Sequence, residues 1–443
     1  MAIKADYETR PISDEVWGRM KALRREHWSH TFTAQAEGGI CATGLAWQFQ
    51  PMLAAFGKFG NPSIGTNFAR AAREGTGPNG LRKYIDIATA KGLTPMCGAI
   101  GAHVGQVYEG VSFVGPKGEK ITPDFVFQPM GCHAIYKGAQ ICSSILGLPM
   151  LMIDIPGICS DSARDYILNQ LLDAIEWIEK KTKKKFDDER FAEAVRNTSR
   201  ARVLWSKTAS LMKNIPSPIT TRQAMSLNQP LIAYPYSKGT VEYSEALYAE
   251  VKDRVEKGIA GTPFERKRLM SVGIHPLYRP DVLRWPEQYG AVFMAGGPAY
   301  GAWIRTEDSH TIPGKTVEER GLALKTREEA LRAMIFLNLP PENPRETTRD
   351  SLVVINQVHD WKVDAVMLHM ARRCPAGQGT FGIFDLKADL LAAGIPAGTY
   401  EASEADPNEF DEVRIREEFE RFLESLGLTK IAMETESATD DYA

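Results

Sequence analysis

One type of segment occurs twice in this chain and limits what the chain can fold into. Residues 124–132 and residues 364–374 each begin at an aspartate and pass through apolar residues to a cysteine, Cys132 or Cys374. Each cysteine is followed by a helix-length segment, a Gly-x-Pro motif and a second strand-like run. The repeat predicts strand, cysteine, helix and strand in both halves of the chain, which is typical of parallel α/β sheets.

The repeat also predicts where the two cysteines lie. Functional groups of an open parallel sheet collect beyond the carboxyl ends of its strands. Two similar sheets that face each other would each present a thiol at that edge. We therefore expect Cys132 and Cys374 to reach one shared site.

The spacing of apolar residues predicts how the rest of the chain is organised. From Asp161 they recur at helical spacing, and strand and helix patterns alternate again after residue 262, with residues 328–337 among them. Residues 49–59 are expected to form a helix in the first half. We expect an α/β fold with two similar doubly wound parallel-sheet domains, Rossmann-like or flavodoxin-like, and a helical middle region. The expected divisions are a helical lead (1–37), an N-terminal α/β domain (38–160), the helical region (161–262), a C-terminal α/β domain (263–430) and a disordered acidic tail (431–443).

Charge and hydropathy exclude several classes of partner. The 53 Lys and Arg residues and the 56 Asp and Glu residues give a formal net charge of -3, so no overall field attracts nucleic acid or an anionic membrane. No apolar run reaches the roughly 18 residues that a membrane-spanning helix needs, and the N-terminus has no apolar secretory core. We expect a cytoplasmic protein that binds neither nucleic acid nor membrane.

The chain has six cysteines, and none of them forms a C-x-x-C pair. This spacing argues against zinc ribbons, thioredoxin-like sites and the short-spaced ferredoxin pattern. Most single cysteines are small buried hydrophobic residues, and we assign Cys142 to the core because its neighbours are apolar at helical spacing. Cys97, Cys132 and Cys374 differ, because the Gly, Pro or Arg residues beside them predict sharp turns. The chain has no P-loop and no dinucleotide-binding glycine motif, so any use of ATP would require another chain.

The sequence around Cys97, Cys132 and Cys374 resembles the iron–sulfur subunits of the benzoyl-CoA reductase and 2-hydroxyacyl-CoA dehydratase family. The resemblance covers most of residues 40–427 and is closest to the larger, B-type core subunit of ATP-dependent class I benzoyl-CoA reductase. It implies that the three cysteines hold one [4Fe–4S] cluster per chain between two α/β domains, with the fourth iron open or bound by a ligand other than cysteine. Cys41 falls in another loop near the family's active site, where a fourth ligand and a pocket residue are both open interpretations.

The same resemblance implies partners. They are a related iron–sulfur core subunit, ATP-hydrolysing activator subunits that carry a bridging [4Fe–4S] cluster, reduced ferredoxin as electron donor, and an aromatic acyl-CoA substrate.

Length and the segments 359–366 and 400–406 look more like the reductase branch than the dehydratases. The sequence therefore favours an oxidoreductase, a core subunit of benzoyl-CoA reductase that converts the ring of benzoyl-CoA to a cyclic dienoyl-CoA by Birch-like electron and proton steps. Two alternatives stay open. One is a 2-hydroxyacyl-CoA dehydratase subunit, in which the electron is recycled, and the other is a non-catalytic electron relay beside a catalytic sister subunit.

A Birch-like reaction needs a positioned acid in a water-free pocket. His133 is the first candidate because it directly follows a predicted ligand, with a hydrogen bond to a cluster sulfur and a plain packing role as alternatives. Glu401 and Glu404 follow a predicted strand and are the weaker acid or orienting candidates, against a simple role as exposed carboxylates. His369 lies inside an apolar strand and is expected to be a core histidine.

Overall fold

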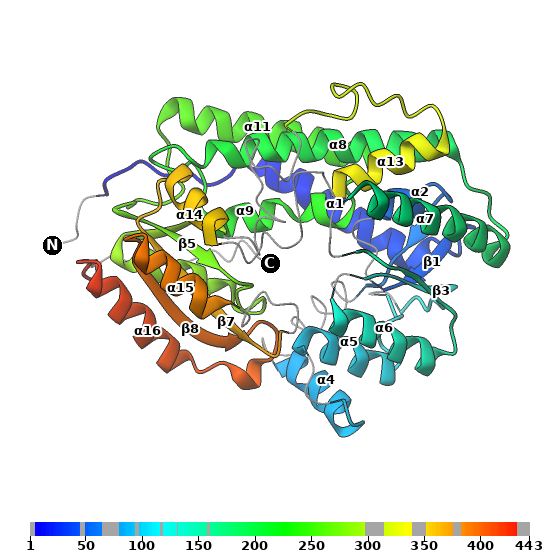
Figure 1. The fold of residues 1–443 in the computed structure, drawn as a ribbon, viewed down its shortest axis with the longest axis horizontal. Helices are drawn as coiled ribbons and strands as arrows, with labels where there is room; N and C mark the ends of the chain where they lie inside the picture. Colours follow the sequence, from blue (N-terminus) through cyan, green and yellow to red (C-terminus); the bar gives the residue numbers. More distant parts are fainter. Residues whose placement is uncertain are drawn as a thin grey trace.

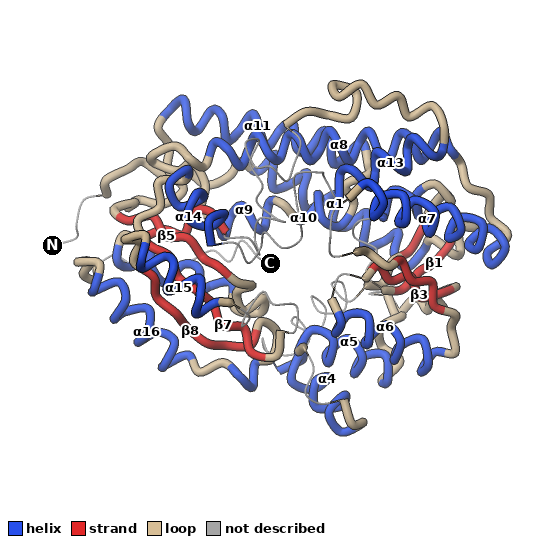
Figure 2. Tube along the Cα trace, viewed as in Figure 1, coloured by secondary structure: helices blue, strands red, loops and turns tan. Residues whose placement is uncertain are grey.

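The computed structural model describes residues 5–44, 49–63, 79–93, 97–115, 118–130, 132–156, 160–296, 314–338, 351–374 and 382–431. Within these residues the chain is an α/β protein with two four-stranded parallel sheets and many helices (Figures 1 and 2). The predicted α/β class is thus confirmed. The predicted acidic tail lies almost entirely outside the described residues, and no helix within them is long and apolar enough to cross a membrane.

The first sheet has the strand order β2, β1, β3, β4. Strand β3 is the apolar run before Cys132, and β4 is the run after the first Gly-x-Pro motif, as the repeat predicts. The two strands are neighbours, with Val126 opposite Met150. The strands are β1 (Ile40–Thr43), β2 (Phe59–Gly60), β3 (Phe125–Pro129) and β4 (Met150–Ile153).

The second sheet has the order β6, β5, β7, β8, which is the same order counted from its own first strand. Strand β7 precedes Cys374, and β8 follows the second Gly-x-Pro motif, with Val366 opposite Ala397. The sequence repeat therefore corresponds to a repeat of sheet topology. The strands are β5 (Lys267–Val272), β6 (Ala291–Gly296), β7 (Ala365–Arg372) and β8 (Ala397–Ser403).

Helices pack on both faces of each sheet. Alternate side chains of the second sheet enter two separate cores: Met270 and Leu368 face one, and Leu269 and Met367 face the other. The first sheet likewise packs against α2, α7 and α8 on one face and against α5 and α6 on the other. The helices in the first half are α1 (Asp14–Thr33), α2 (Gln50–Ala54), α4 (Asn79–Ala90), α5 (Gly98–Tyr108) and α6 (His133–Leu146).

The middle of the chain is helical, as the apolar spacing from Asp161 predicts. Side-chain caps begin its longest helices, since Ser160 accepts a hydrogen bond from the backbone N–H of Ala163 and Asp187 accepts one from that of Arg190. These helices are α7 (Asp161–Thr182), α8 (Asp188–Leu211), α9 (Thr221–Leu227), α10 (Gln229–Ala233) and α11 (Lys238–Lys257). The C-terminal half adds η2 (Pro280–Tyr289), α13 (Arg327–Asn338), α14 (Ser351–Asp360), α15 (Ile383–Ala392), η4 (Pro407–Glu409) and α16 (Glu412–Ser425).

The helix predicted for residues 49–59 is shorter than expected. It ends at Ala54, and Phe59 and Gly60 instead form β2 beside β1. The residues of α2 and of β2 are buried alike. Their apolar pattern therefore does not distinguish one long helix from a short helix followed by a strand.

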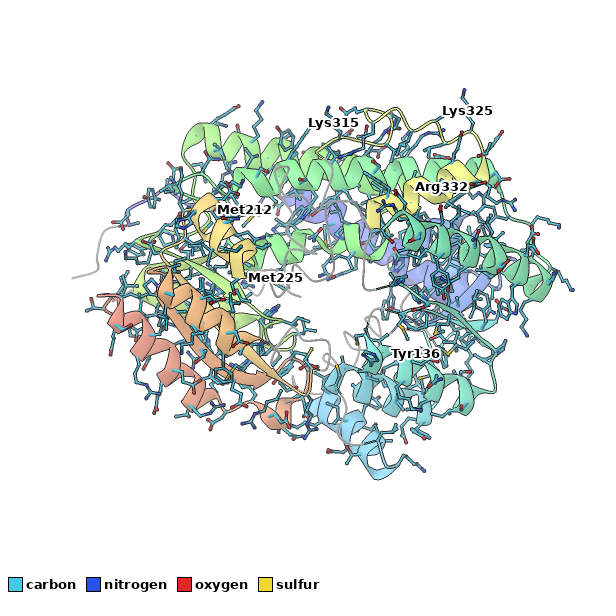
Figure 3. The ribbon with its side chains drawn as sticks, in the orientation of Figure 1. Tyr136, Met212, Met225, Lys315, Lys325 and Arg332 are labelled. Atoms are coloured by element: carbon cyan, nitrogen blue, oxygen red, sulfur yellow. The ribbon has the colours of Figure 1, made fainter. Side chains whose placement is uncertain are left out.

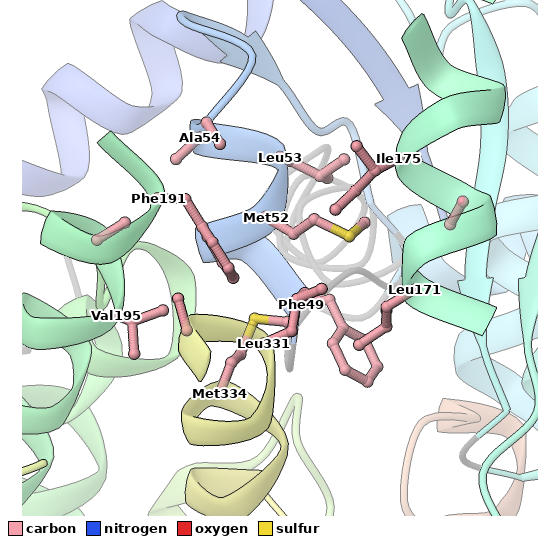
Figure 4. Close-up of a cluster of buried hydrophobic side chains, with 14 of the residues drawn as sticks. Phe49, Met52, Leu53, Ala54, Leu171, Ile175, Phe191, Val195, Leu331 and Met334 are labelled. Atoms are coloured by element: carbon pink, nitrogen blue, oxygen red, sulfur yellow. The ribbon is translucent and has the colours of Figure 1, made fainter. Parts of the chain in front are cut away.

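Helix α13 packs against the first sheet's helices, although its residues fall inside the predicted C-terminal domain. Leu331 and Met334 are buried in the core that contains β1, β3, α7 and α8. Arg332 on the same helix forms an ion pair with Asp165 of α7, with 2.6 Å between Nη1 and Oδ1, and lies beside that helix in Figure 3. Figure 4 shows the two buried side chains of α13 among Phe49, which caps α2, and side chains of α2, α7 and α8: Met52, Leu53, Ala54, Leu171, Ile175, Phe191 and Val195.

Helix α1 makes the reverse exchange. Val16 and Met20 are buried in the core that contains β5, β6 and β7 of the second sheet, although they belong to the N-terminal lead. Each sheet therefore completes its core with a segment from the other end of the chain. The packing of α1 and α13 joins the two halves.

Substitution of Leu331 by Ala tests this exchange. We expect the free energy of unfolding to fall by about 2–5 kcal/mol, because the change leaves a cavity in the first sheet's core. Urea unfolding followed by circular dichroism measures it. Arg332→Ala is the matched control, and loss of its exposed ion pair should cost at most about 1 kcal/mol. Equal effects of the two substitutions would contradict the packing described for α13.

Candidate metal centre

Cys132 occupies the N-cap of α6, directly after β3. Its Sγ accepts a hydrogen bond from the backbone N–H of Ile135 at 3.4 Å, the position in which Ser or Asp normally caps a helix. The side chain is partly exposed. The thiol is thus held at the edge of the sheet where the repeat predicts it.

Cys97 occupies the equivalent N-cap position of α5. Helices α5 and α6 touch near their N-termini, because Gly138 leaves room for the side chain of Ile100. Cys97 and Cys132 pack against the same buried cluster. The two thiols therefore begin adjacent helices and lie beside each other's packing partners.

Cys374 follows β7 after one turning residue. Strand β7 ends at Arg372, and Arg373 adopts the left-handed conformation with a φ of 62°. The Arg373 guanidinium then pairs with Asp406 at 3.4 Å and with Glu409 at 2.6 Å. These ion pairs fix the residue next to Cys374 onto the segment that follows β8.

That segment, residues 404–406, forms a turn that also touches Cys97. The contact between Glu404 Oε1 and Cys97 Sγ is 3.0 Å, and the cysteine donates in it. A Cβ added to Gly98 would lie 2.8 Å from the backbone of Ala405 and Asp406, so only glycine allows this approach. The 404–406 turn therefore brings the end of the second sheet against the helix that begins at Cys97.

Figure 1 shows the same relation at the level of the fold. The segment that follows β8 extends towards α4 and α5 of the first half. Arg82 of α4 donates a hydrogen bond to the carbonyl of Pro407 at 3.2 Å. The edges of the two sheets that carry the cysteines thus meet.

The charges at this contact depend on burial. Burial, and then the neighbouring Glu404 carboxylate, raise the pKa of the Cys97 thiol well above its usual range. Burial also raises the pKa of Glu404. Both shifts favour the uncharged forms of the two groups that meet in this contact.

The three cysteines lie in one region, but their sulfur atoms do not surround a single metal position. Among the described residues, no three Cys, His, Asp or Glu side chains are close enough together to hold one metal ion. Residues 94–96, 131 and 375–381, which adjoin the three cysteines, lie outside the described part of the chain. A cubane binds each thiolate at a different iron, so it needs a wider set of ligands than a single ion does.

The two predicted acids have different surroundings. His133 is exposed at the first residue of α6, next to Cys132. Glu401 lies within β8 rather than after it, and its Oε1 accepts a hydrogen bond from Arg372 Nε at 2.7 Å. That hydrogen bond lowers the pKa of Glu401, so its surroundings favour a charged carboxylate over a proton donor.

The remaining candidates lie in the core. Cys142 is buried on α6, as predicted. His369 is also buried, stacks on Tyr400, and both of its ring nitrogens face backbone carbonyls, those of Ile274 and Ala402. Burial lowers its pKa to about 4, so it is a neutral core histidine, as expected. Cys41 is buried in β1, and burial raises the pKa of its thiol.

Sequence reasoning noted the glycine and arginine beside the cysteines and the segment 400–406, but it missed the contacts that Arg373, Asp406 and Gly98 make. Their importance arises from two contacts: Arg373 pairs with Asp406, 33 positions further along the chain, and Gly98 approaches residues 405 and 406, about 300 positions away. The only sequence signal is the glycine directly after Cys97. It shows that something approaches the helix closely, without showing what.

Comparison with known proteins identifies the family. Residues 75–426, more than half of the chain, match the family described as 2-hydroxyglutaryl-CoA dehydratase, D-component. The chain belongs to this family. Its members are known to carry iron–sulfur clusters, and the resemblance that the sequence suggested is confirmed at this level.

Individual relatives in the family are distant. The (R)-2-hydroxyglutaryl-CoA dehydratase alpha subunit of Acidaminococcus fermentans is 25% identical over 69% of this chain and 60% of its own length. The (R)-phenyllactyl-CoA dehydratase alpha subunit of Clostridium sporogenes is 24% identical over 66% of this chain and 68% of its own length. The B subunit of benzoyl-CoA reductase from Thauera aromatica is 26% identical over 41% of this chain and 44% of its own length. The chain therefore spans less than two thirds of the first of these relatives.

Substitution of Gly98 by Ala tests the contact between α5 and the 404–406 turn. The added methyl group cannot fit, so we expect the free energy of unfolding to fall by about 1–3 kcal/mol. Gly101→Ala in the same helix is the control. Its methyl would meet Ile85 at an ordinary 3.7 Å, and the better helix propensity of Ala should leave stability unchanged or raised by up to about 1 kcal/mol. Urea unfolding of both variants measures the difference, and a neutral Gly98→Ala would argue against the contact.

Proposed function

We propose that this chain is an iron–sulfur subunit of a 2-hydroxyacyl-CoA dehydratase. The observation that carries the proposal is the extent of similarity: the two dehydratase alpha subunits align with 69% and 66% of the chain, and the benzoyl-CoA reductase relative aligns with 41%. The sequence alone favoured the reductase. The comparisons support the dehydratase, the alternative left open above, better than that first preference.

Cys97, Cys132 and Cys374 are the proposed cluster ligands. The donor set fits an iron–sulfur cluster, because thiolates are the ligands that such clusters take. Two of the thiols begin adjacent helices, and the third is joined to them through Arg373 and the 404–406 turn. Ligands from both halves of the chain make cluster binding depend on the packing of the halves.

A bound cluster would supply single electrons and an iron that can bind a substrate oxygen. In a dehydratase the substrate loses water and the electron is returned, so the product is an enoyl-CoA with no net reduction. His133 is exposed next to a ligand cysteine and is the proposed group that moves a proton at the substrate. Glu401 is proposed to orient Arg372, since the two form a 2.7 Å ion pair.

The proposed partners follow from the family. They are a related iron–sulfur subunit and an ATP-hydrolysing activator with its own cluster, supplied with electrons by reduced ferredoxin. The relatives are named as alpha or B subunits, which supports assembly with other chains.

Iron content tests the cluster. Co-expressed anaerobically with its candidate partner, the chain should lose about four irons per complex in each of Cys97→Ser, Cys132→Ser and Cys374→Ser. Cys142→Ala is the control, because Cys142 is a buried core residue whose loss should leave iron content unchanged. Iron and acid-labile sulfide are measured together. Unchanged iron in the three Ser variants would reject the ligand assignment.

Electron stoichiometry separates the dehydratase from the reductase. With activator, ATP and reductant, we expect (R)-2-hydroxyglutaryl-CoA or (R)-phenyllactyl-CoA to give the enoyl-CoA with far fewer electrons consumed than product formed. Consumption of one electron pair per cyclic dienoyl-CoA, with benzoyl-CoA as substrate, would instead establish the reductase. If the acyl-CoA perturbs only the sister chain's cluster spectrum, this chain is an electron relay.

A further inference from the structure

Glu404 carries a buried oxygen without a partner. The residue directly follows β8 and is 3% exposed. Its Oε1 meets Cys97 Sγ at 3.0 Å, whereas its Oε2 has no hydrogen-bond partner among the described residues. A buried carboxylate oxygen without a partner is costly, so this position points to a ligand that would satisfy the oxygen.

The arginines near Glu404 are engaged elsewhere. Arg373 pairs with Asp406 and Glu409, and Arg372 pairs with Glu401. Glu404 has no ion pair of its own in the described part of the chain. The unpartnered oxygen thus lies at the cysteine site with no protein cation from these residues to balance it.

The backbone holds Glu404 firmly in this position. Its carbonyl accepts a hydrogen bond from the N–H of Leu277 at 2.8 Å. Ser403 Oγ accepts hydrogen bonds from the N–H groups of Ala405 at 3.3 Å and Asp406 at 3.0 Å. With Gly98 pressed against the next two residues, the carboxylate is fixed beside Cys97 before any metal binds.

The same position in the first sheet provides an internal comparison. Asp154 directly follows β4, as Glu404 directly follows β8. Its carboxylate accepts a hydrogen bond from the Tyr166 hydroxyl at 3.3 Å, and Gln170 bonds its backbone at both the N–H and the carbonyl. The repeat therefore places an acidic residue at the end of both sheets. Of these two residues, Glu404 is the one that combines a contact to a cysteine with an unpartnered oxygen.

We propose that Glu404 is the oxygen ligand of the cluster iron that the three cysteines leave without a thiolate. This inference rests on the proposed cluster. Carboxylate is a donor that iron accepts, and Glu404 would hold the iron through the oxygen that has no partner in the protein.

Hyperfine spectroscopy tests the ligand directly. The complex is prepared anaerobically with ¹³C in the side-chain carboxyl of glutamate, and the reduced cluster is examined by electron–nuclear double resonance. We expect a ¹³C coupling in the wild-type chain that disappears in Glu404→Gln and persists in Glu401→Gln. Wild-type protein with full iron and no coupling would overturn the assignment, whether or not the variants fold.

Mild oxidation with ferricyanide gives an independent readout. A cluster with one carboxylate ligand should release about one iron and form a three-iron species, and Glu404→Cys should prevent this by completing a set of thiolates. Asp154→Cys, at the equivalent position of the first sheet, should leave the loss unchanged. If wild type and Glu404→Cys both start with full iron and release the same amount, the role of Glu404 is overturned and the proposed function is not. Absence of iron from the wild-type complex would overturn the proposed function, and this inference with it.

Discussion

The close approach of Gly98 to the 404–406 turn is the contact on which the candidate site depends. It places the N-terminus of α5, with Cys97, against the end of β8 without an intervening side chain. Cys132 shares this position through the packing of α5 on α6, and Cys374 shares it through the ion pairs of Arg373. A displacement of α5 from this turn would separate donors from the two sheets, even if each sheet remained folded.

The exchange of α1 and α13 fixes the position of the two sheets relative to each other. Each helix contributes buried side chains to the core of the sheet at the other end of the chain. Neither half can then unfold without removing apolar side chains from the other, so the two should unfold together. A site assembled from both halves needs this coupling, because small relative movements change the distances between its ligands.

Local patterns in the sequence were sufficient for part of this structure. The apolar run before each cysteine and the Gly-x-Pro after it predicted β3, β4, β7 and β8, since these signals lie within short segments. The destination of α13 was missed, because an amphipathic helix does not encode which sheet it covers. The ion pair between Arg373 and Asp406 was missed for a related reason, because a contact between two loops leaves no periodic signal.

The repeat is symmetrical in topology but not in chemistry. Both sheets have the same strand order, and in this order ligands bind where the third strand of the sheet lies beside the first. Cys132 follows the third strand of one sheet and Cys374 that of the other. The first sheet adds a second cysteine, Cys97, and its equivalent acidic residue is satisfied by α7. The second sheet adds Glu404, which contacts Cys97 through one oxygen and keeps the other unpartnered. Two similar halves thus offer different donors, which is what a cluster with one chemically distinct iron requires.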